Sequence, residues 1–146
     1  MGKFVTVRLG NEQYGVPIEN VQSIETIKPI TRIPGTPAFV KGVMNLRGTV
    51  LGVVDLGYLF GLKLNELNED TRIVIVNGDD DTVGWLVDAA DNVVDIEDKD
   101  IQPASEDNEF LLGLAKRNDD VLAILDLSCV LNNSRNQIRS GYPLSV

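Results

Sequence analysis

Residues 39–56 read FVKGVMNLRGTVLGVVDL, and residues 110–127 read FLLGLAKRNDDVLAILDL. The two stretches align without a gap at an offset of 71 residues, which places Phe39 against Phe110. Self-similarity at a fixed offset is typical of a repeated supersecondary unit. We therefore expect two copies of one unit, spanning approximately residues 3–62 and 71–131.

The strands of each copy are visible as short apolar patterns. Val50–Val54 and Val121–Leu125 are continuously apolar, which predicts innermost strands covered on both faces. A looser match sets 31–34 against 100–103 at an offset of 69 residues. Mainly β architecture with short helices follows from this pattern.

Two hairpins are predicted outside the aligned stretches. Alternation of apolar and polar residues over 5–9, followed by a turn at 11–13 and a strand over 13–18, predicts the first. The second joins 72–77 to 82–88, with Val83, Trp85 and Val87 sharing one face.

Each innermost strand ends in an Asp-Leu pair followed by a short helical pattern. Asp55 and Asp126 are placed to cap helices over 55–60 and 126–131, because aspartate is a favoured N-cap residue. A catalytic role for these strand-end carboxylates is the less favoured alternative, since both copies place Asp at the same junction. The acidic linker 62–70 separates the copies, and the tail from 132 loses periodicity and is expected to be mobile or a frayed helix.

Composition narrows the function. The 146 residues carry a net charge of −9, with no histidine and a single cysteine, Cys129, which lies in an apolar run and is expected to be a small buried hydrophobe. The usual general base and zinc ligand are therefore missing, and the negative charge opposes binding to nucleic acid or anionic lipid. No apolar run is long enough to span a membrane, so we expect a cytoplasmic protein whose partners are proteins.

Other motifs fail on their spacing. The glycines at 42 and 48 are too far apart for a phosphate loop and no lysine precedes Thr49. The acidic run 79–81 lacks the glycine and glutamate of a calcium loop and is expected to be a solvated turn, as are the carboxylates at 97–100 and 106–107. We expect no catalytic residues, no metal and no cofactor.

The Asn45-Leu46-Arg47-Gly48 segment interrupts the apolar pattern with two polar groups that need partners. One interpretation is a turn in which Arg47 pairs with an acidic side chain and Gly48 supplies a positive φ. The other is an interaction site, and the residues alone favour neither. The second copy has Lys-Arg-Asn-Asp over 116–119, so this chemistry belongs to the first copy alone.

The order and spacing of several segments resemble the CheW family of chemotaxis coupling proteins, over about residues 3–131. The segment from Phe39 through Asn45-Leu46-Arg47-Gly48 to Asp55-Leu56 is the most specific. The others are Phe4–Gly10, Tyr14–Val16, Val21–Ile24, Thr31–Pro34, Gly84–Asp88 and Phe110–Leu127.

The resemblance implies two five-stranded barrels of the Src-homology type packed side by side, interleaved within one domain over 1–146 with a tail at 132–146. It also implies a non-enzymatic adaptor that binds the cytoplasmic tip of a receptor helical hairpin in the groove between the barrels. The regulatory domain of the histidine kinase CheA would bind barrel ends, and other copies of the chain would join an array recruited to membrane receptors.

The family pattern places interaction residues at Val21, Gly42 and Arg47, with Asn45 and Gly48 in the same turn. Second-barrel candidates are Val83, Gly84, Ala90 and Val93. The family commonly has glutamate where Ser23 stands, and Glu25, on the same strand face, is a candidate to supply that charge. Barrel core is the favoured alternative for Val21, Val83 and Val93, and a bulge that lets another backbone approach is an equal alternative for Gly42.

Two rival functions remain. The first is the adaptor half of a CheV-type protein, which would need an appended receiver domain beyond Val146. The second is a small barrel that binds a ligand or an oligonucleotide, which the acidity and an aromatic content of 5% disfavour.

Overall fold

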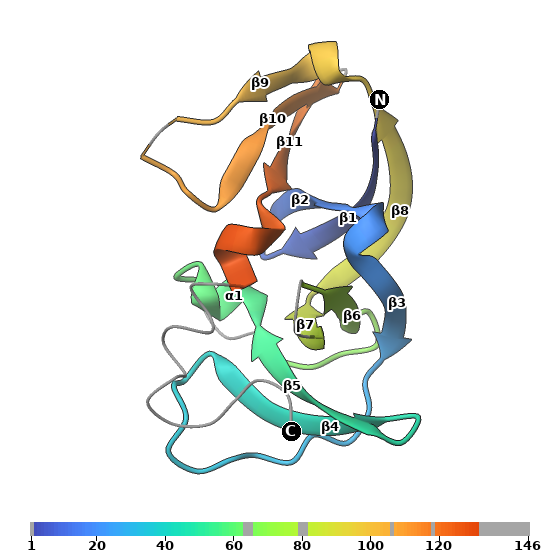
Figure 1. Cartoon of the computed structure of the whole chain (residues 1–146), viewed down its shortest axis with the longest axis vertical. Coiled ribbons are helices and arrows are strands. Elements are labelled where there is room, and N and C mark those ends of the chain that lie inside the picture. The colour runs from blue at the N-terminus through green and yellow to red at the C-terminus, as the bar shows by residue number, and fades with distance from the viewer. Residues whose placement is uncertain (1, 63–65, 79–81, 106, 118, 132–146) are drawn as a thin grey trace.

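The computed structural model describes residues 2–62, 66–78, 82–105, 107–117 and 119–131 (Figure 1). The strands are β1 (Gly2–Leu9), β2 (Glu12–Pro17), β3 (Val21–Thr26), β4 (Val40–Leu46), β5 (Thr49–Asp55), β6 (Arg72–Asn77), β7 (Thr82–Val87), β8 (Ala89–Ile96), β9 (Ile101–Pro103), β10 (Leu111–Arg117) and β11 (Asp120–Leu125). Helix α1 spans Leu56–Leu59, 127–131 is also helical, and the 3₁₀ turns are η1 (Ile18–Asn20) and η2 (Asp98–Asp100). The prediction of a mainly β chain with short helices is confirmed.

The strands form two sheets that exchange hairpins between the sequence copies. One sheet has the order β8-β1-β2-β11-β10-β9 and the other β3-β6-β7-β5-β4. The β1–β2 hairpin of the first copy therefore joins strands of the second, and β6–β7 of the second joins strands of the first. Two β subdomains are confirmed. Within the described residues they have six and five strands, and neither copy forms a sheet from its own strands alone.

The hydrophobic core lies inside and between these subdomains. A cluster with Met44, Leu51 and Ile73 fills one, and a cluster with Phe4, Leu122 and Ile124 fills the other. The largest cluster combines β1 and β2 with the opposite face of β6–β7, and Figure 1 shows these hairpins meeting at the centre of the molecule. The subdomains therefore share a core.

The predicted innermost strands are central, but their cover is incomplete. β5 lies between β4 and β7, and β11 lies between β2 and β10. Val50 and Val121 are 37% and 58% exposed, so the expectation of cover on both faces is wrong at these positions. Each valine is the second residue of its strand, next to a hairpin turn, and lies beyond the part of the strand that the core covers.

The predicted hairpins are present, and the face shared by Val83, Trp85 and Val87 is buried. The first hairpin turns at 10–11, between Leu9 and Glu12, and not at 11–13 as expected. Within the described ranges, no helix is both long and apolar enough to cross a membrane. Several predictions fall on residues 63–65, 79–81, 106 and 132–146, which lie outside the described residues, including the solvated turn expected at 79–81 and the tail.

The copies share a backbone device at Gly42 and Gly113. Both lie at bulges, and a Cβ atom on Gly42 would lie 2.1 Å from the Thr31 carbonyl oxygen. A Cβ on Gly113 would lie 2.6 Å from the Gln102 carbonyl oxygen. Thr31 bridges Val43 as Gln102 pairs with Leu114, so the offset of 71 holds here and the looser match at 69 was wrong.

The predicted helix caps are confirmed in both copies. The Asp55 Oδ1 atom accepts a hydrogen bond from the Tyr58 amide at 3.0 Å, and the Asp126 Oδ1 atom accepts one from the Cys129 amide at 3.2 Å. Cys129 is half-buried, less than expected, and burial raises the pKa of its thiol. The strand-end aspartates thus have a structural role.

Candidate functional site

The turn between β4 and β5 is built by Asn45 and Gly48. Leu46 pairs with Thr49, which leaves Arg47 and Gly48 as a two-residue loop with φ angles of 50° and 89°. Positive φ at both central positions is what a type I′ hairpin turn requires. The Asn45 Oδ1 atom accepts a hydrogen bond from the Gly48 amide at 2.8 Å and holds the loop.

Arg47 is strained in this turn. Among the described residues it is the one non-glycine residue with positive φ. This backbone region costs an ordinary L-residue about 1–2 kcal/mol, because its Cβ atom approaches the carbonyl oxygen. The side chain is 70% exposed, so burial does not repay that cost.

Glu25 on β3 receives the exposed arginine. The Arg47 Nη2 atom lies 3.3 Å from Oε2 of Glu25, and the Lys28 Nζ atom lies 3.7 Å from Oε1. The neighbouring Ser23 hydroxyl, and then the charges of Arg47 and Lys28, hold the pKa of Glu25 below its usual value, although burial acts in the opposite direction. The Glu25 carboxylate is therefore ionised and only 9% exposed, and it pairs with the exposed guanidinium of Arg47.

The direction of the side chains on β3 explains this pairing. Ser23 and Glu25 share one face, and Glu25 is buried, while Ile24 on the other face is 43% exposed. Glu25 therefore stands on the Ser23 side of the strand, as expected, and contacts Arg47. The interpretation of Arg47 as a turn residue paired with an acidic side chain is confirmed, and its exposure leaves it available to a partner.

Val21 and Gly42 have different surroundings. Val21 is half-buried at the start of β3, pairs with Val76 and packs against the shared core. Gly42 is buried in a bulge, and the backbone of Thr31 lies close to it. This confirms the alternative interpretation of Gly42 as a bulge that lets another backbone approach. Gly42 thus lets the Thr31 backbone approach β4.

The four second-barrel candidates do not lie in one sheet. Val83 and Gly84 lie on β7 in the sheet that holds β3–β5, and Ala90 and Val93 lie on β8 in the other sheet. Assigning all four residues to the second barrel was therefore wrong, because the β6–β7 hairpin joins the sheet of the first copy. Val83 is fully buried, which confirms the alternative of a core position. Val93 is 51% exposed, so the core alternative is wrong for this residue. Ala90 is half-buried.

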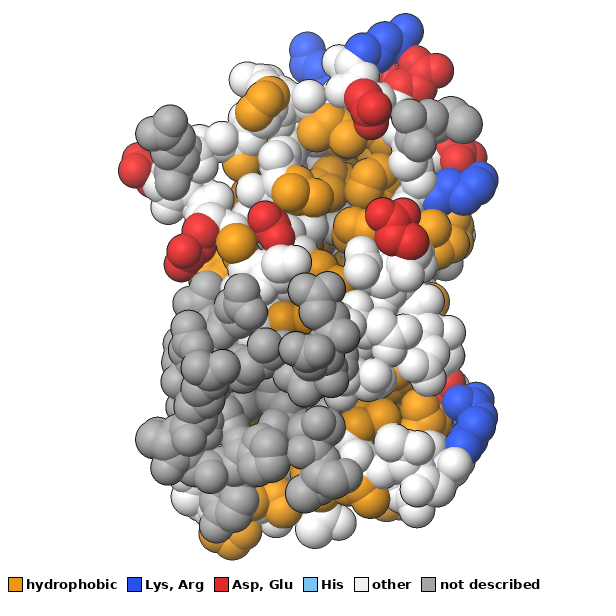
Figure 2. Space-filling view, viewed as in Figure 1, with side chains coloured by type: hydrophobic (Ala, Val, Ile, Leu, Met, Phe, Trp, Pro, Cys, Tyr) orange, Lys and Arg blue, Asp and Glu red, His pale blue; other side chains and the backbone are white. Residues whose placement is uncertain are grey.

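Two surface features were not predicted from the sequence. The first is the ion pair between Glu25 and Lys28, which the spacing of three residues could have indicated. Figure 2 shows hydrophobic side chains at the surface of the upper part of the molecule, which in Figure 1 holds β10 and β11. Leu112, Leu114 and Val121 on these strands are exposed, and their alternation with buried residues was the overlooked signal.

An aromatic cavity of about 340 Å³ lies between the copies. Tyr14, Phe60 and Phe110 line it, and the ring centroids of Phe60 lie 5.9 Å from those of Tyr14 and 5.2 Å from those of Phe110. Desolvation raises the pKa of Tyr14, with a smaller contribution from Glu12.

In the described part of the chain, no three acidic or cysteine side chains are grouped to hold a metal ion.

Comparison with known proteins adds a family. The sequence model of the CheW-like domain matches residues 3–135. The chain is 37% identical to the chemotaxis protein CheW of Helicobacter pylori over 88% of this chain and 81% of that protein, and 32% identical to CheW of Bacillus subtilis over 92% and 90%. The crystal structure of the scaffolding protein TtCheW from Thermoanaerobacter tengcongensis superposes with a TM-score of 0.80 at 35% identity, covering 86% of this chain and 88% of that one.

Proposed function

The chain belongs to the CheW family of chemotaxis scaffold proteins, and from this premise we propose that it couples chemoreceptors to the histidine kinase CheA by binding both and catalyses no reaction. The observation that carries the proposal is the Arg47 turn. A strained, exposed arginine held by a buried carboxylate costs the fold stability, and such costs are found where a partner uses the group.

Charge and shape support a protein partner for this turn. Arg47 is a planar, permanently charged donor that suits carboxylates, and arginine is enriched in the centres of protein interfaces. Glu25 fixes the position of the Arg47 guanidinium, so we propose it as a positioning residue. It would take the role of the glutamate that the family commonly has at the position of Ser23. Asn45 and Gly48 hold the turn.

We place the receptor hairpin beside β3 and β8, one edge strand from each sheet. Figure 1 shows both strands on the same side of the molecule, where the subdomains meet. Half-buried Val21 and Ala90 and exposed Val93 would offer apolar contacts to a helix laid along these two strands. Val83 and Gly84 would act from the core, by shaping β7.

The kinase is proposed to bind the barrel ends through its homologous regulatory domain, and further copies of the chain would extend the array. The whole of 1–146 would act as one interleaved domain in the cytoplasm, recruited to receptors by these contacts. The shared core supports transmission between the two subdomains by packing.

An adaptor module of the CheV type is the second candidate. The chain is 29% identical to CheV3 of Helicobacter pylori over 82% of its length but only 41% of that protein. The CheW proteins of Helicobacter pylori and Bacillus subtilis are more similar to this chain, at 37% and 32% identity, which favours the first candidate.

Co-sedimentation with receptor fragments and CheA tests the proposal. Arg47→Asn keeps a residue suited to the turn and removes the cation, and Lys99→Gln removes an exposed cation that pairs with Glu97 elsewhere. We expect the wild type and Lys99→Gln to assemble and Arg47→Asn to assemble weakly. Gly42→Asp is a poor probe, because its Cβ atom would meet the Thr31 backbone.

Two results would count against the proposal. Full assembly by folded Arg47→Asn would refute the site. Absence of the wild type from every pellet would refute the coupling function.

A further inference from the structure

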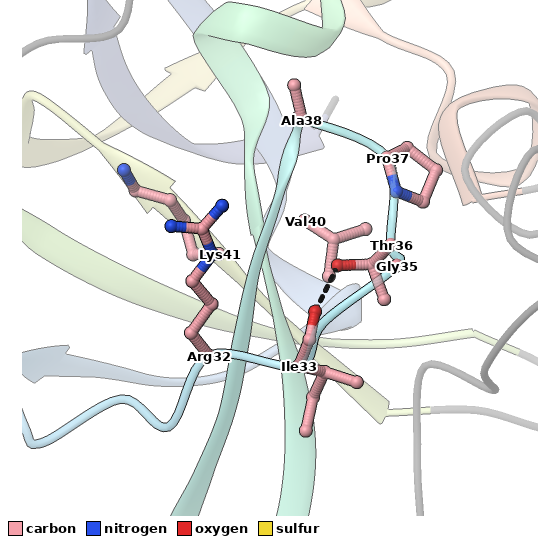
Figure 3. A pocket seen from close by; sticks show the side chains of 8 residues that line it. All are labelled: Arg32, Ile33, Gly35, Thr36, Pro37, Ala38, Val40 and Lys41. Carbon is pink, nitrogen blue, oxygen red and sulfur yellow. Dashed lines mark hydrogen bonds between the residues drawn. The ribbon is translucent and has the colours of Figure 1, made fainter.

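A second surface feature lies at the other end of β4. The loop 32–38 folds against this strand and leaves a cavity of about 270 Å³ (Figure 3). The Thr36 hydroxyl donates a hydrogen bond to the Ile33 carbonyl oxygen at 2.8 Å, and the Val40 amide donates one to the Pro37 carbonyl oxygen at 3.0 Å. Thr31, bridged to Val43, anchors the start of the loop.

Two cations flank this cavity. Figure 3 shows the Arg32 guanidinium beside the Lys41 side chain, on one side of the β4 ribbon. Lys41 is near enough to lower the pKa of buried Asp55, where burial is the larger effect and raises it. Among the described residues, however, neither Arg32 nor Lys41 has a carboxylate within ion-pair distance, whereas Arg47 and Lys28 share one.

The internal repeat shows that folding does not require this pair. The offset of 71 that equates Thr31 with Gln102 places Pro103 at the position of Arg32 and Leu112 at that of Lys41. The same bulge and strand pairing form there without either cation. Two like charges placed side by side repel each other, so the first copy tolerates a cost that the second avoids.

We propose that Arg32 and Lys41 bind an acidic side chain in an extended segment of a partner protein, with Ile33, Pro37 and Val40 contacting a neighbouring apolar side chain. The cations supply the charge complementarity, and the cavity beside them supplies the apolar wall. A free anion is disfavoured, because the chain as a whole carries a charge of −9 and repels it, whereas a peptide adds apolar contact.

This subsite is separate from the proposed Arg47 surface. Lys41 lies near the start of β4 and Arg47 follows its end, so six residues of extended strand place them about 20 Å apart. The inference extends the scaffold function to a further contact but does not depend on it, since the test below uses neither receptor nor kinase.

The test is an NMR titration of the ¹⁵N-labelled full chain with three probes. These are the capped peptide Leu-Glu-Glu-Leu, the uncharged peptide Leu-Gln-Gln-Leu and inorganic phosphate. We expect saturable amide shifts within 32–41 with the acidic peptide alone, weakened by added salt. Arg32→Gln and Lys41→Gln should each weaken binding up to about fivefold, and Lys99→Gln should not.

Three results would overturn the inference. Equal shifts with both peptides would show that the apolar wall alone binds, and tighter saturation by phosphate would show a site for free oxyanions. No shift within 32–41 would remove the subsite altogether. Because Arg32 is exposed and Lys41 is only half-buried, the undisturbed part of each spectrum reports whether the variant is folded.

Discussion

Replacing Arg47 with asparagine should stabilise the fold while weakening partner binding. Asn-Gly is the preferred pair of a type I′ turn, so Arg47→Asn removes most of the strain, about 1 kcal/mol. The lost ion pair with Glu25 offsets this by roughly 0.5 kcal/mol, because the arginine is 70% exposed and Lys28 remains 3.7 Å from the carboxylate. The net expectation is a gain of about 0.5 kcal/mol.

Urea unfolding followed by tryptophan fluorescence measures this change. Trp85 is the single tryptophan of the chain and is fully buried in the shared core, so its emission reports global unfolding. Arg47→Ala is the matched control, because it also loses the ion pair but lacks the short polar side chain with which asparagine tolerates a positive φ. It should be about 1 kcal/mol less stable than Arg47→Asn.

Two outcomes would refute the reasoning on Arg47. Equal stability of Arg47→Asn and Arg47→Ala would mean that the turn stores no strain. A loss of more than about 1 kcal/mol in Arg47→Asn would mean that the contact with buried Glu25 outweighs the strain, and that the arginine serves folding.

Three further predictions use the same unfolding assay. The stability advantage of wild type over Glu25→Gln should be constant above pH 4.5, the ordinary pKa, and should fall at lower pH, because the folded-state pKa is lowered; a level difference down to pH 3 would contradict this. Asp55→Asn keeps a capping oxygen and removes a carboxylate whose pKa is raised mainly by burial, so it should gain on the wild type as the pH rises above 3.8, and no gain by pH 7 would count against it. Gly42→Ala should cost about 3 kcal/mol, from backbone strain and a clash with the Thr31 carbonyl, whereas Gly48→Ala, with nothing within 4 Å of its Cβ, should cost about 1 kcal/mol; similar losses would remove the role of the close approach.

Local features of this fold could be read from the sequence. The caps at Asp55 and Asp126 depend on residues three positions away, and each hairpin depends on period-two alternation across one turn. The exchange of hairpins could not be derived from these patterns. It depends on parallel pairings that are distant in sequence, such as Val53 with Gly84 and Ile124 with Gly15, and the similar apolar patterns of the copies fit either partner.

The same limit applies to the site. The turn at Asn45–Gly48 follows from local chemistry, and the contact of Arg47 with Glu25 needs the position of β3. A chain with 22 acidic residues offers many partners for one arginine, and only the strand pairing selects among them. The inward direction of Glu25 was also hidden, because β3 turns polar side chains inward and Ile24 outward, against the usual pattern.

The internal repeat separates what folds this chain from what it uses. The bulge glycines Gly42 and Gly113 occur in both copies, as do the helix caps, and these features maintain the two sheets. The second copy has Pro103, Leu112 and Asn118 at the positions of Arg32, Lys41 and Arg47, and it builds the same strands without these three cations. Features that one copy folds without are not required by the architecture, so their cost points to partners. All of them lie in or beside the β4–β5 hairpin, which makes this hairpin the part of the surface where substitutions should change binding most and folding least.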